Sequence, residues 1–153
     1  MKNGILALGV MLLLGVNTQA NASTTVCVFD LLGKSGEAYK VMEEWALTAK
    51  TWRADVRLVS YQSEAQAEND FEQGKCDGVY MTSMRARRYN KFAGSVDAIG
   101  AVPSYAIAQK AISFALDQRN QRRLTSTDGN KVYEVVGISH IGLAYIFVKD
   151  KKM

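Results

Sequence analysis

The sequence predicts an α/β fold in which a mainly parallel sheet is flanked by helices. Residues 26–29 are apolar without alternation, and this pattern is typical of a central strand buried on both faces. Further strand-like segments follow, each separated from the last by one helix-like segment and short turns. That order favours right-handed crossovers, and hence parallel strands.

The first strand is expected to lead into a long amphipathic helix. Residues 30–36 have the composition of a turn, and Ser35 is placed to cap a helix that runs to about Trp52. Apolar residues recur near helical spacing along this segment and are expected to face the sheet. They are Ala38, Met42, Trp45, Ala49 and Trp52.

A second strand, a second helix and a third strand are expected next. Residues 54–61 form the strand, and Ser63 with Gln66 has the spacing of a capping box at the start of the helix. Gly74 stands where a glycine commonly ends a helix. Residues 76–81 then form the third strand.

The second half begins with a polar, basic loop at 82–90 and a short helix with a turn at 92–103. Ser104 is expected to cap a long amphipathic helix through about Leu124, with a run of arginines that suits its C-terminal dipole. The buried stripe of this helix is expected to be Ile107, Ala111, Phe114 and Ala115. A turn at 125–130 and closing strands at 132–138 and 143–148 complete the chain.

The N-terminus has the three parts of a secretory signal peptide. A lysine lies at position 2, residues 5–16 form an apolar run, and 20–22 read Ala-Asn-Ala. The apolar run is too short for a stable membrane anchor. We therefore expect cleavage after Ala22 and a periplasmic protein. The expected organisation is a signal peptide at 1–22, a first α/β lobe at 23–143, and at 144–153 the start of a crossover strand to a second lobe that this chain lacks.

Charge and cysteine content limit the classes of function. The formal charge of the whole chain is +4, which is mild and is not arranged as the basic face that nucleic-acid binding requires. Cys27 and Cys76 both lie outside the signal peptide. In an oxidising compartment they are able to form a disulfide, and the alternative is two buried thiols on neighbouring strands. The sequence leaves both readings open.

The residues give little support to catalysis. His140 is the only histidine, and it lies in an apolar region where a packed, hydrogen-bonded role is expected. No serine stands in a nucleophile elbow, and the chain is poor in the usual zinc ligands. We therefore predict a protein that is not an enzyme, with no metal and no cofactor.

A binding site is expected where the strands of the parallel sheet end. Ligands of open α/β sheets lie beyond the carboxyl ends of the strands, and here the loops at 30–37, 60–63 and 82–89 are rich in hydrogen-bonding side chains. Arg85 or Arg88 is suited to hold a carboxylate with its guanidinium fork. The predicted ligand-binding residues are Asp30, Ser35, Glu37, Tyr61, Tyr80, Thr82, Ser83, Arg85 and Arg88.

Four segments together resemble one family of periplasmic solute-binding proteins. They are VCVFDLLGKSG at 26–36, CDGV at 76–79, TSMRARRY at 82–89 and GSVDAIGA at 94–101. The family is the AdeT group, which has been linked to RND-type drug efflux, and the likeness covers essentially the whole mature chain.

The resemblance implies a two-lobed binding protein, similar in layout to the receptors of TRAP-type transporters. Such a protein captures a small-molecule solute and presents it to an inner-membrane transporter. One alternative is an accessory protein of an RND-type multidrug or aminoglycoside efflux system, which would bring antibiotic resistance. Another is a truncated fragment without function, since family members are about twice this length.

Overall fold

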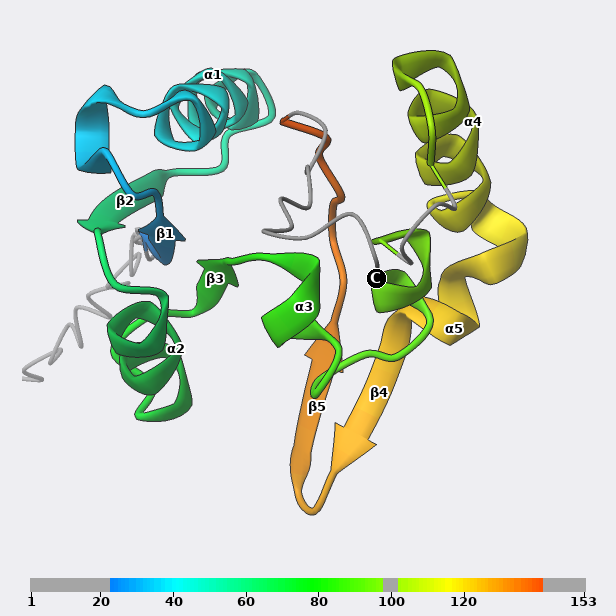
Figure 1. The fold of residues 1–153 in the computed structure, drawn as a ribbon. Coiled ribbons are helices and arrows are strands. Elements are labelled where there is room, and N and C mark those ends of the chain that lie inside the picture. Colours follow the sequence, from blue (N-terminus) through cyan, green and yellow to red (C-terminus); the bar gives the residue numbers. More distant parts are fainter. Residues whose placement is uncertain (1–22, 98–101, 142–153) are drawn as a thin grey trace, which may run out of the picture.

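The computed structural model describes residues 23–97 and 102–141, and these confirm the α/β fold (Figure 1). Three parallel strands, β1 (Thr24–Phe29), β2 (Val56–Tyr61) and β3 (Gly78–Tyr80), form a sheet in the order β2-β1-β3. The central strand β1 contributes Val28 and Cys27, whose side chains are fully buried. The expected signal peptide at 1–22 and strand at 143–148 lie outside the described residues.

Two helices cover opposite faces of this sheet (Figure 1). Helix α1 (Glu37–Thr51) packs through Tyr39 against Val26 and Val28 of β1. Helix α2 (Glu64–Glu72) packs through Ala67 on the other face, beside Cys27. Alternate residues of β1 therefore serve the two cores, as expected for a strand with no solvent-facing side.

Helix α1 starts differently from the prediction. A short 3-10 turn, η1 (Gly33–Ser35), precedes it, and Gly36 rather than Ser35 is the N-cap. The Asp30 carboxylate replaces the expected serine cap by accepting from the Tyr39 amide at 3.2 Å. A side chain at Gly36 would meet that carboxylate within 2.0 Å. The chain therefore caps α1 from the end of β1, and the turn brings Ser35 to the surface instead.

The predicted inward stripe of α1 is partly wrong. Ala38 is buried and Met42 and Ala49 are half-buried, but Trp45 is 43% exposed and Trp52 is 78% exposed. The face that packs on the sheet instead includes Tyr39 and Ala46. The helical spacing of apolar residues was identified correctly, but the face of α1 that packs on the sheet is displaced toward residues 39 and 46. The two tryptophans lie outside that face.

Helix α2 begins at the predicted residue without the predicted side-chain bond. Ser63 is the N-cap, yet its hydroxyl makes no capping hydrogen bond. Because that bond is missing, the predicted capping box of Ser63 and Gln66 does not form. The C-terminal prediction is confirmed, because Gly74 has φ +73° and its amide donates to Phe71 O at 3.0 Å. With the Lys75 amide donating to Asp70 O at 2.9 Å, this is a Schellman end.

A disulfide joins Cys27 of β1 to Cys76, immediately before β3, with a Cα–Cα distance of 5.8 Å. Both residues are buried beneath α2. The bond therefore ties the entry to β3 to the centre of the sheet.

The expected long helix after Ser104 is broken into three. Helix α4 (Tyr105–Ala115) is capped as predicted, with Ser104 Oγ accepting from the Ile107 amide. The short helices η3 (Gln118–Asn120) and α5 (Gln121–Leu124) follow. The break lies at Asp117, which adopts an extended backbone and caps η3.

The predicted stripe of α4 is only partly buried. Ala115 is buried and Ala111 is half-buried, but Ile107 and Phe114 are 42% and 59% exposed. Ala108 is the other buried residue of this helix. Its main contact among the described elements is η2 (Ala93–Asp97), which lies in the region where a short helix was expected. That contact is too small to cover the whole apolar face.

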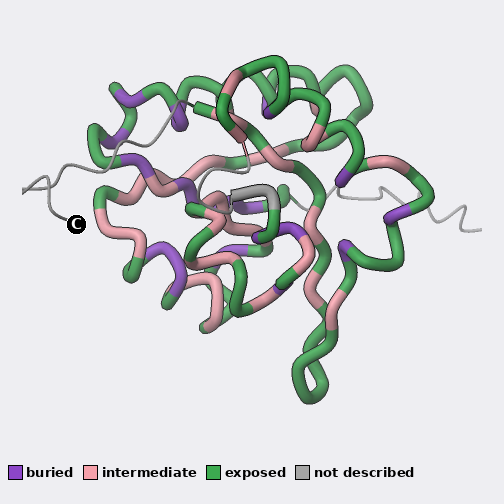
Figure 2. The backbone as a smooth tube through the Cα atoms, turned by 45° about the vertical axis from the view of Figure 1, so that its right-hand side comes forward, coloured by how far each residue is buried: buried purple, intermediate pink, exposed green. Residues whose placement is uncertain are grey.

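A β-hairpin replaces the predicted turn at 125–130. Strand β4 (Thr125–Asp128) pairs antiparallel with β5 (Lys131–Glu134). The turn between them has Gly129 at φ +57°, as a two-residue hairpin turn requires. Strand β5 ends at Glu134 rather than Ile138. Figure 2 shows the hairpin reaching away from the buried parts of the chain.

No helix in the described parts of the chain is both long and apolar enough to cross a bilayer.

Candidate functional site

Three loops meet at the carboxyl edge of the sheet. The Gln62 side chain, after β2, donates to Leu31 O at 3.3 Å in the loop after β1. The Glu64 carboxylate accepts from the Thr82 amide at 2.7 Å, in the loop after β3. Because α1 and α2 cross on opposite faces, the strand order reverses between β1 and β3. Ligand crevices of open α/β sheets lie at such a reversal.

Asp30 is buried at this edge and its carboxylate is already used. One oxygen accepts from the Leu32 amide at 2.9 Å and the other from Tyr39 at 3.2 Å. The negative charge of Asp30 thus occupies the N-terminus of α1, where an anion would otherwise be stabilised. The arrangement leaves the helix end satisfied from within the chain.

The other predicted residues of this edge are not all brought together. Ser35 and Glu37 lie exposed around η1 and the start of α1. Tyr61 turns to the α2 face, where its hydroxyl donates to Asp70 at 2.7 Å, and this bond raises the pKa of Tyr61. Tyr80 packs on the α1 face, with its hydroxyl 2.5 Å from Ser139 Oγ. The two tyrosines therefore do not share a site.

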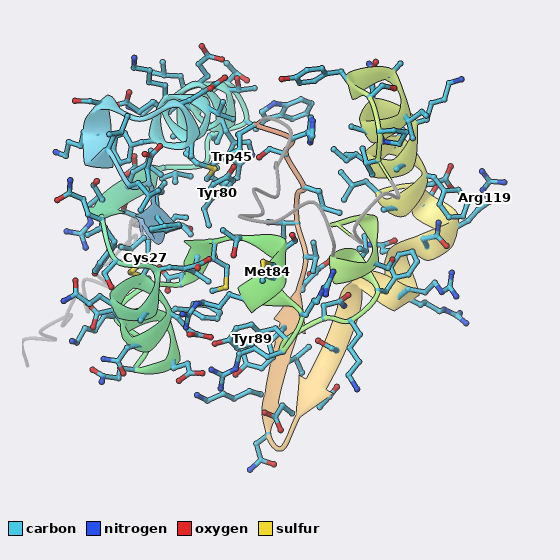
Figure 3. The ribbon with its side chains drawn as sticks, viewed as in Figure 1. Cys27, Trp45, Tyr80, Met84, Tyr89 and Arg119 are labelled. Carbon is cyan, nitrogen blue, oxygen red and sulfur yellow. A yellow bond between two sulfur atoms is a disulfide. The ribbon has the colours of Figure 1, made fainter. Side chains whose placement is uncertain are left out.

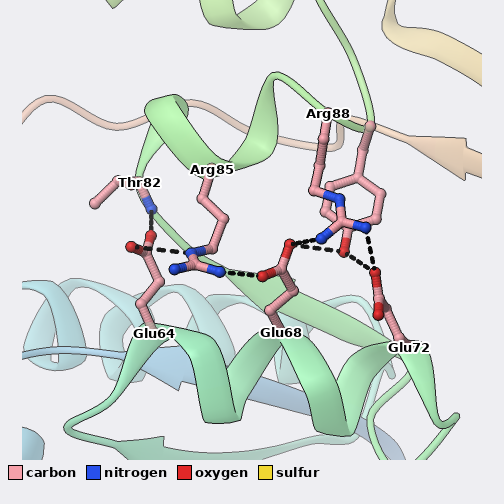
Figure 4. Close-up of polar contacts among 7 residues, drawn as sticks. Glu64, Glu68, Glu72, Thr82, Arg85 and Arg88 are labelled. Atoms are coloured by element: carbon pink, nitrogen blue, oxygen red, sulfur yellow. Dashed lines mark hydrogen bonds and ion pairs between the residues drawn. The ribbon is translucent and has the colours of Figure 1, made fainter.

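The predicted arginines are held by glutamates of α2 (Figure 4). Glu64, Glu68 and Glu72 follow one another at i, i+4 and i+8, and we call them the glutamate ladder. Arg85, on the short helix α3 (Ser83–Ala86), bonds to Glu64 and Glu68. Arg88 lies 2.9 Å from Glu68 and 3.1 Å from Glu72. The ladder thus binds the segment after β3 along the length of α2.

Glu68 is the centre of this network. Glu68 is only 4% exposed, and its carboxylate also accepts a hydrogen bond from the Tyr89 hydroxyl at 3.0 Å. Burial alone would raise the pKa of Glu68, but hydrogen bonds from Arg85 and Tyr89 and the two guanidinium charges outweigh it, so the pKa is lowered. The pKa of Tyr89 is raised by burial and by its bonds to Glu72 and Glu68. Glu68 is therefore held as a carboxylate by three donors, from Arg85, Arg88 and Tyr89.

Sequence reasoning found the arginines but missed the ladder. The available signal was the spacing of the three glutamates, which places them on one helix face. The sequence analysis also did not identify the exposed apolar side chains at the same edge. Leu31, Leu32 and Met84 are 74%, 70% and 76% exposed, with Met84 on α3 (Figure 3). The edge therefore offers apolar contact surface beside its polar groups.

The comparisons with known proteins point to one family. The family model for solute-binding protein AdeT 1/2 matches residues 43–153. The probable solute-binding protein AdeT1 of Acinetobacter baumannii is 36% identical over 126 residues, which are 82% of this chain and 40% of that protein. The chain thus spans well under half the length of this relative. No solved structure matches the chain.

Proposed function

Because the chain belongs to the AdeT 1/2 family of solute-binding proteins, we propose that it captures a small-molecule solute outside the cytoplasm for a membrane transporter. The observation that carries this proposal is the meeting of the loops after β1, β2 and β3 at one sheet edge. Such an edge is the usual ligand position in this fold class. The family is one of binding proteins, so we propose binding rather than catalysis.

We propose that the solute carries a carboxylate and contacts the loops at 30–37 and 82–88. Arginine has five N–H donors in a planar fork. The ion pairs with the ladder engage Nε and Nη1 of Arg85 and both Nη atoms of Arg88, which leaves N–H donors of both arginines for a solute. Thr82, Ser83 and the exposed Met84 stand on the same segment. In this proposal the glutamate ladder also fixes the segment that meets the solute.

Isothermal titration with succinate as the probe tests the proposal. We expect binding by the unaltered chain and at least a fivefold loss of affinity in Arg85→Ala and in Arg88→Ala. Arg122→Ala is the matched control, because this exposed arginine lies on α5, away from the edge. Circular dichroism of each variant separates lost binding from lost folding.

Equal affinity of both edge variants and the control would remove the arginines from the site. Absence of binding by the well-folded, unaltered chain would refute the carboxylate proposal.

A further inference from the structure

A polar cleft lies between the last turns of α2 and the end of the β4–β5 hairpin. On the helix side it is lined by Asn69, Glu72 and Gln73. Asp128, Asn130 and Lys131 line it on the hairpin side, and Tyr133 also contributes to the lining. Of these residues only Glu72 belongs to the glutamate ladder, where its carboxylate pairs with Arg88. Glu72 lies eight residues along α2 from Glu64, which is about 12 Å on a helix.

Two kinds of contact hold the walls of the cleft in place. The Tyr133 ring lies 4.9 Å from the Tyr89 ring and 6.0 Å from the Phe71 ring, centre to centre. Lys131 Nζ donates to Glu72 O at 3.1 Å, where a cation suits the negative end of the helix dipole. These contacts hold the hairpin against the last turn of α2, at the cleft.

Only one of the three charged residues that line the cleft is paired with an opposite charge. Glu72 is bonded by Arg88 and Tyr89. Lys131 contacts a carbonyl, which leaves two of its three N–H donors. Among residues 23–97 and 102–141, the Asp128 carboxylate has no ion-pair or hydrogen-bond partner. The cleft thus holds one available cation and one available anion.

These opposite charges stand close together on the hairpin, because Asp128 and Lys131 are cross-strand partners beside the turn. The amides of Asn69, Gln73 and Asn130 line the same cleft. Gln73 Nε2 donates to Asn69 Oδ1 at 3.1 Å, and each amide keeps further donors and acceptors. A dianion would face Asp128 and a dication would face Lys131, and each would be opposed by a like charge. A small molecule with one ammonium and one carboxylate meets no such opposition.

We propose that this cleft binds a small zwitterion of the α-amino acid class. Lys131 holds its carboxylate, Asp128 holds its ammonium, and the amides bond its polar side chain. The inference does not depend on the carboxyl-edge site, because it uses different residues and a different ligand charge.

NMR titration of the full ¹⁵N-labelled chain with L-glutamine tests the inference. We expect the largest amide shifts at 69–73 and 128–133, with little change at 82–88. N-acetyl-L-glutamine lacks the ammonium and L-glutaminamide lacks the carboxylate, and each should bind at least fivefold more weakly than L-glutamine.

Variants assign each charge to its residue. Asp128→Asn should weaken L-glutamine at least fivefold but leave N-acetyl-L-glutamine unchanged, since that probe has no ammonium to lose. Lys131→Ala should weaken L-glutamine similarly and leave L-glutaminamide unchanged. Thr127→Ala, an exposed change on the same hairpin, should alter none of these affinities.

Two results would overturn the inference. One is an absence of shifts at the cleft amides at saturating L-glutamine, including the case in which shifts appear only at 82–88. The other is equal loss for all three probes in Asp128→Asn or Lys131→Ala, which would show a general structural effect instead of charge recognition.

Discussion

Helices α1 and α2 cover the same central strand but are attached to it by different means. Helix α1 is held by apolar contacts of Tyr39 with Val26 and Val28, and by the Asp30 cap. Helix α2 presents the small Ala67 to a disulfide, and binds the next segment through the glutamate ladder. The position of α1 thus depends on side-chain packing, whereas α2 also depends on covalent and ionic links to residues beyond it.

The largest expected effect is on the α2 side. Replacing both Cys27 and Cys76 with alanine should lower the free energy of unfolding by about 4 kcal/mol, because the bond closes a long loop in the unfolded chain. Chemical denaturation measures the change. The unaltered chain in dithiothreitol should match the double variant, and an oxidised chain no more stable than that variant would contradict the comparison.

Glu68→Ala should cost about 2 kcal/mol, because it removes the buried carboxylate that accepts hydrogen bonds from both Arg85 and Arg88. Thermal or urea unfolding measures the loss. Glu44→Ala, on the exposed side of α1, is the matched control and should cost under about 0.5 kcal/mol. Equal effects of the two changes would show that the ladder does not stabilise α2.

Low pH should also weaken the contacts of Glu68 with Arg85 and Arg88, without any mutation. The folded-state pKa of Glu68 lies below its usual value of 4.5, so its stabilisation is complete above that value and is lost as the pH falls through the lower, folded-state pKa. Stability should therefore fall on acidification below about pH 4.5. Glu68→Gln should lose less stability over that range, and identical pH profiles for the two chains would contradict the assignment.

Val28→Ala tests the packing on the α1 side and should cost about 2 kcal/mol, because Val28 is fully buried in that core. Val132→Ala removes the same methyl groups from a residue that is 67% exposed, and should be nearly neutral. Urea unfolding compares them. A loss at Val28 as small as at Val132 would mean that the α1 core packs loosely.

The smallest effect should come from the cap of α1. Asp30→Ala removes the acceptor of the Leu32 and Tyr39 amides and should cost about 1 kcal/mol, as lost N-caps do. Hydrogen exchange of the Tyr39 amide should also speed up. Unchanged exchange there would show that the helix end does not need this carboxylate.

The comparison also explains what could be read from the sequence. The unalternating run at 26–29 predicted a strand buried on both faces, and the spacing of strands and helices predicted the parallel sheet. Gly74 and Ser104 were correctly read as a helix end and a cap, because these signals are local. Trp45 and Trp52 were misplaced, since periodicity identifies an apolar stripe without showing what covers it.

The candidate site also has one part that the sequence predicted and one part that it did not. The loops at the carboxyl edge follow from strand order, so their location was predictable. The ion pairs of Arg85 and Arg88 with the ladder were not predictable, because the two arginines lie 17 and 20 positions from Glu68 in the sequence. A basic loop and an acidic helix each have several candidate partners until the packing of α3 on α2 is known.

The disulfide has a consequence for how the protein is made. Its ring contains β2, α1 and α2 and closes at residue 76. A chain that emerges N-terminus first exposes both cysteines before α3, α4 and the hairpin have appeared. The bond can therefore form before the downstream elements are available, and folding in an oxidising compartment would allow the sheet to be cross-linked first. In a reducing cytoplasm the whole chain would have to fold without this cross-link.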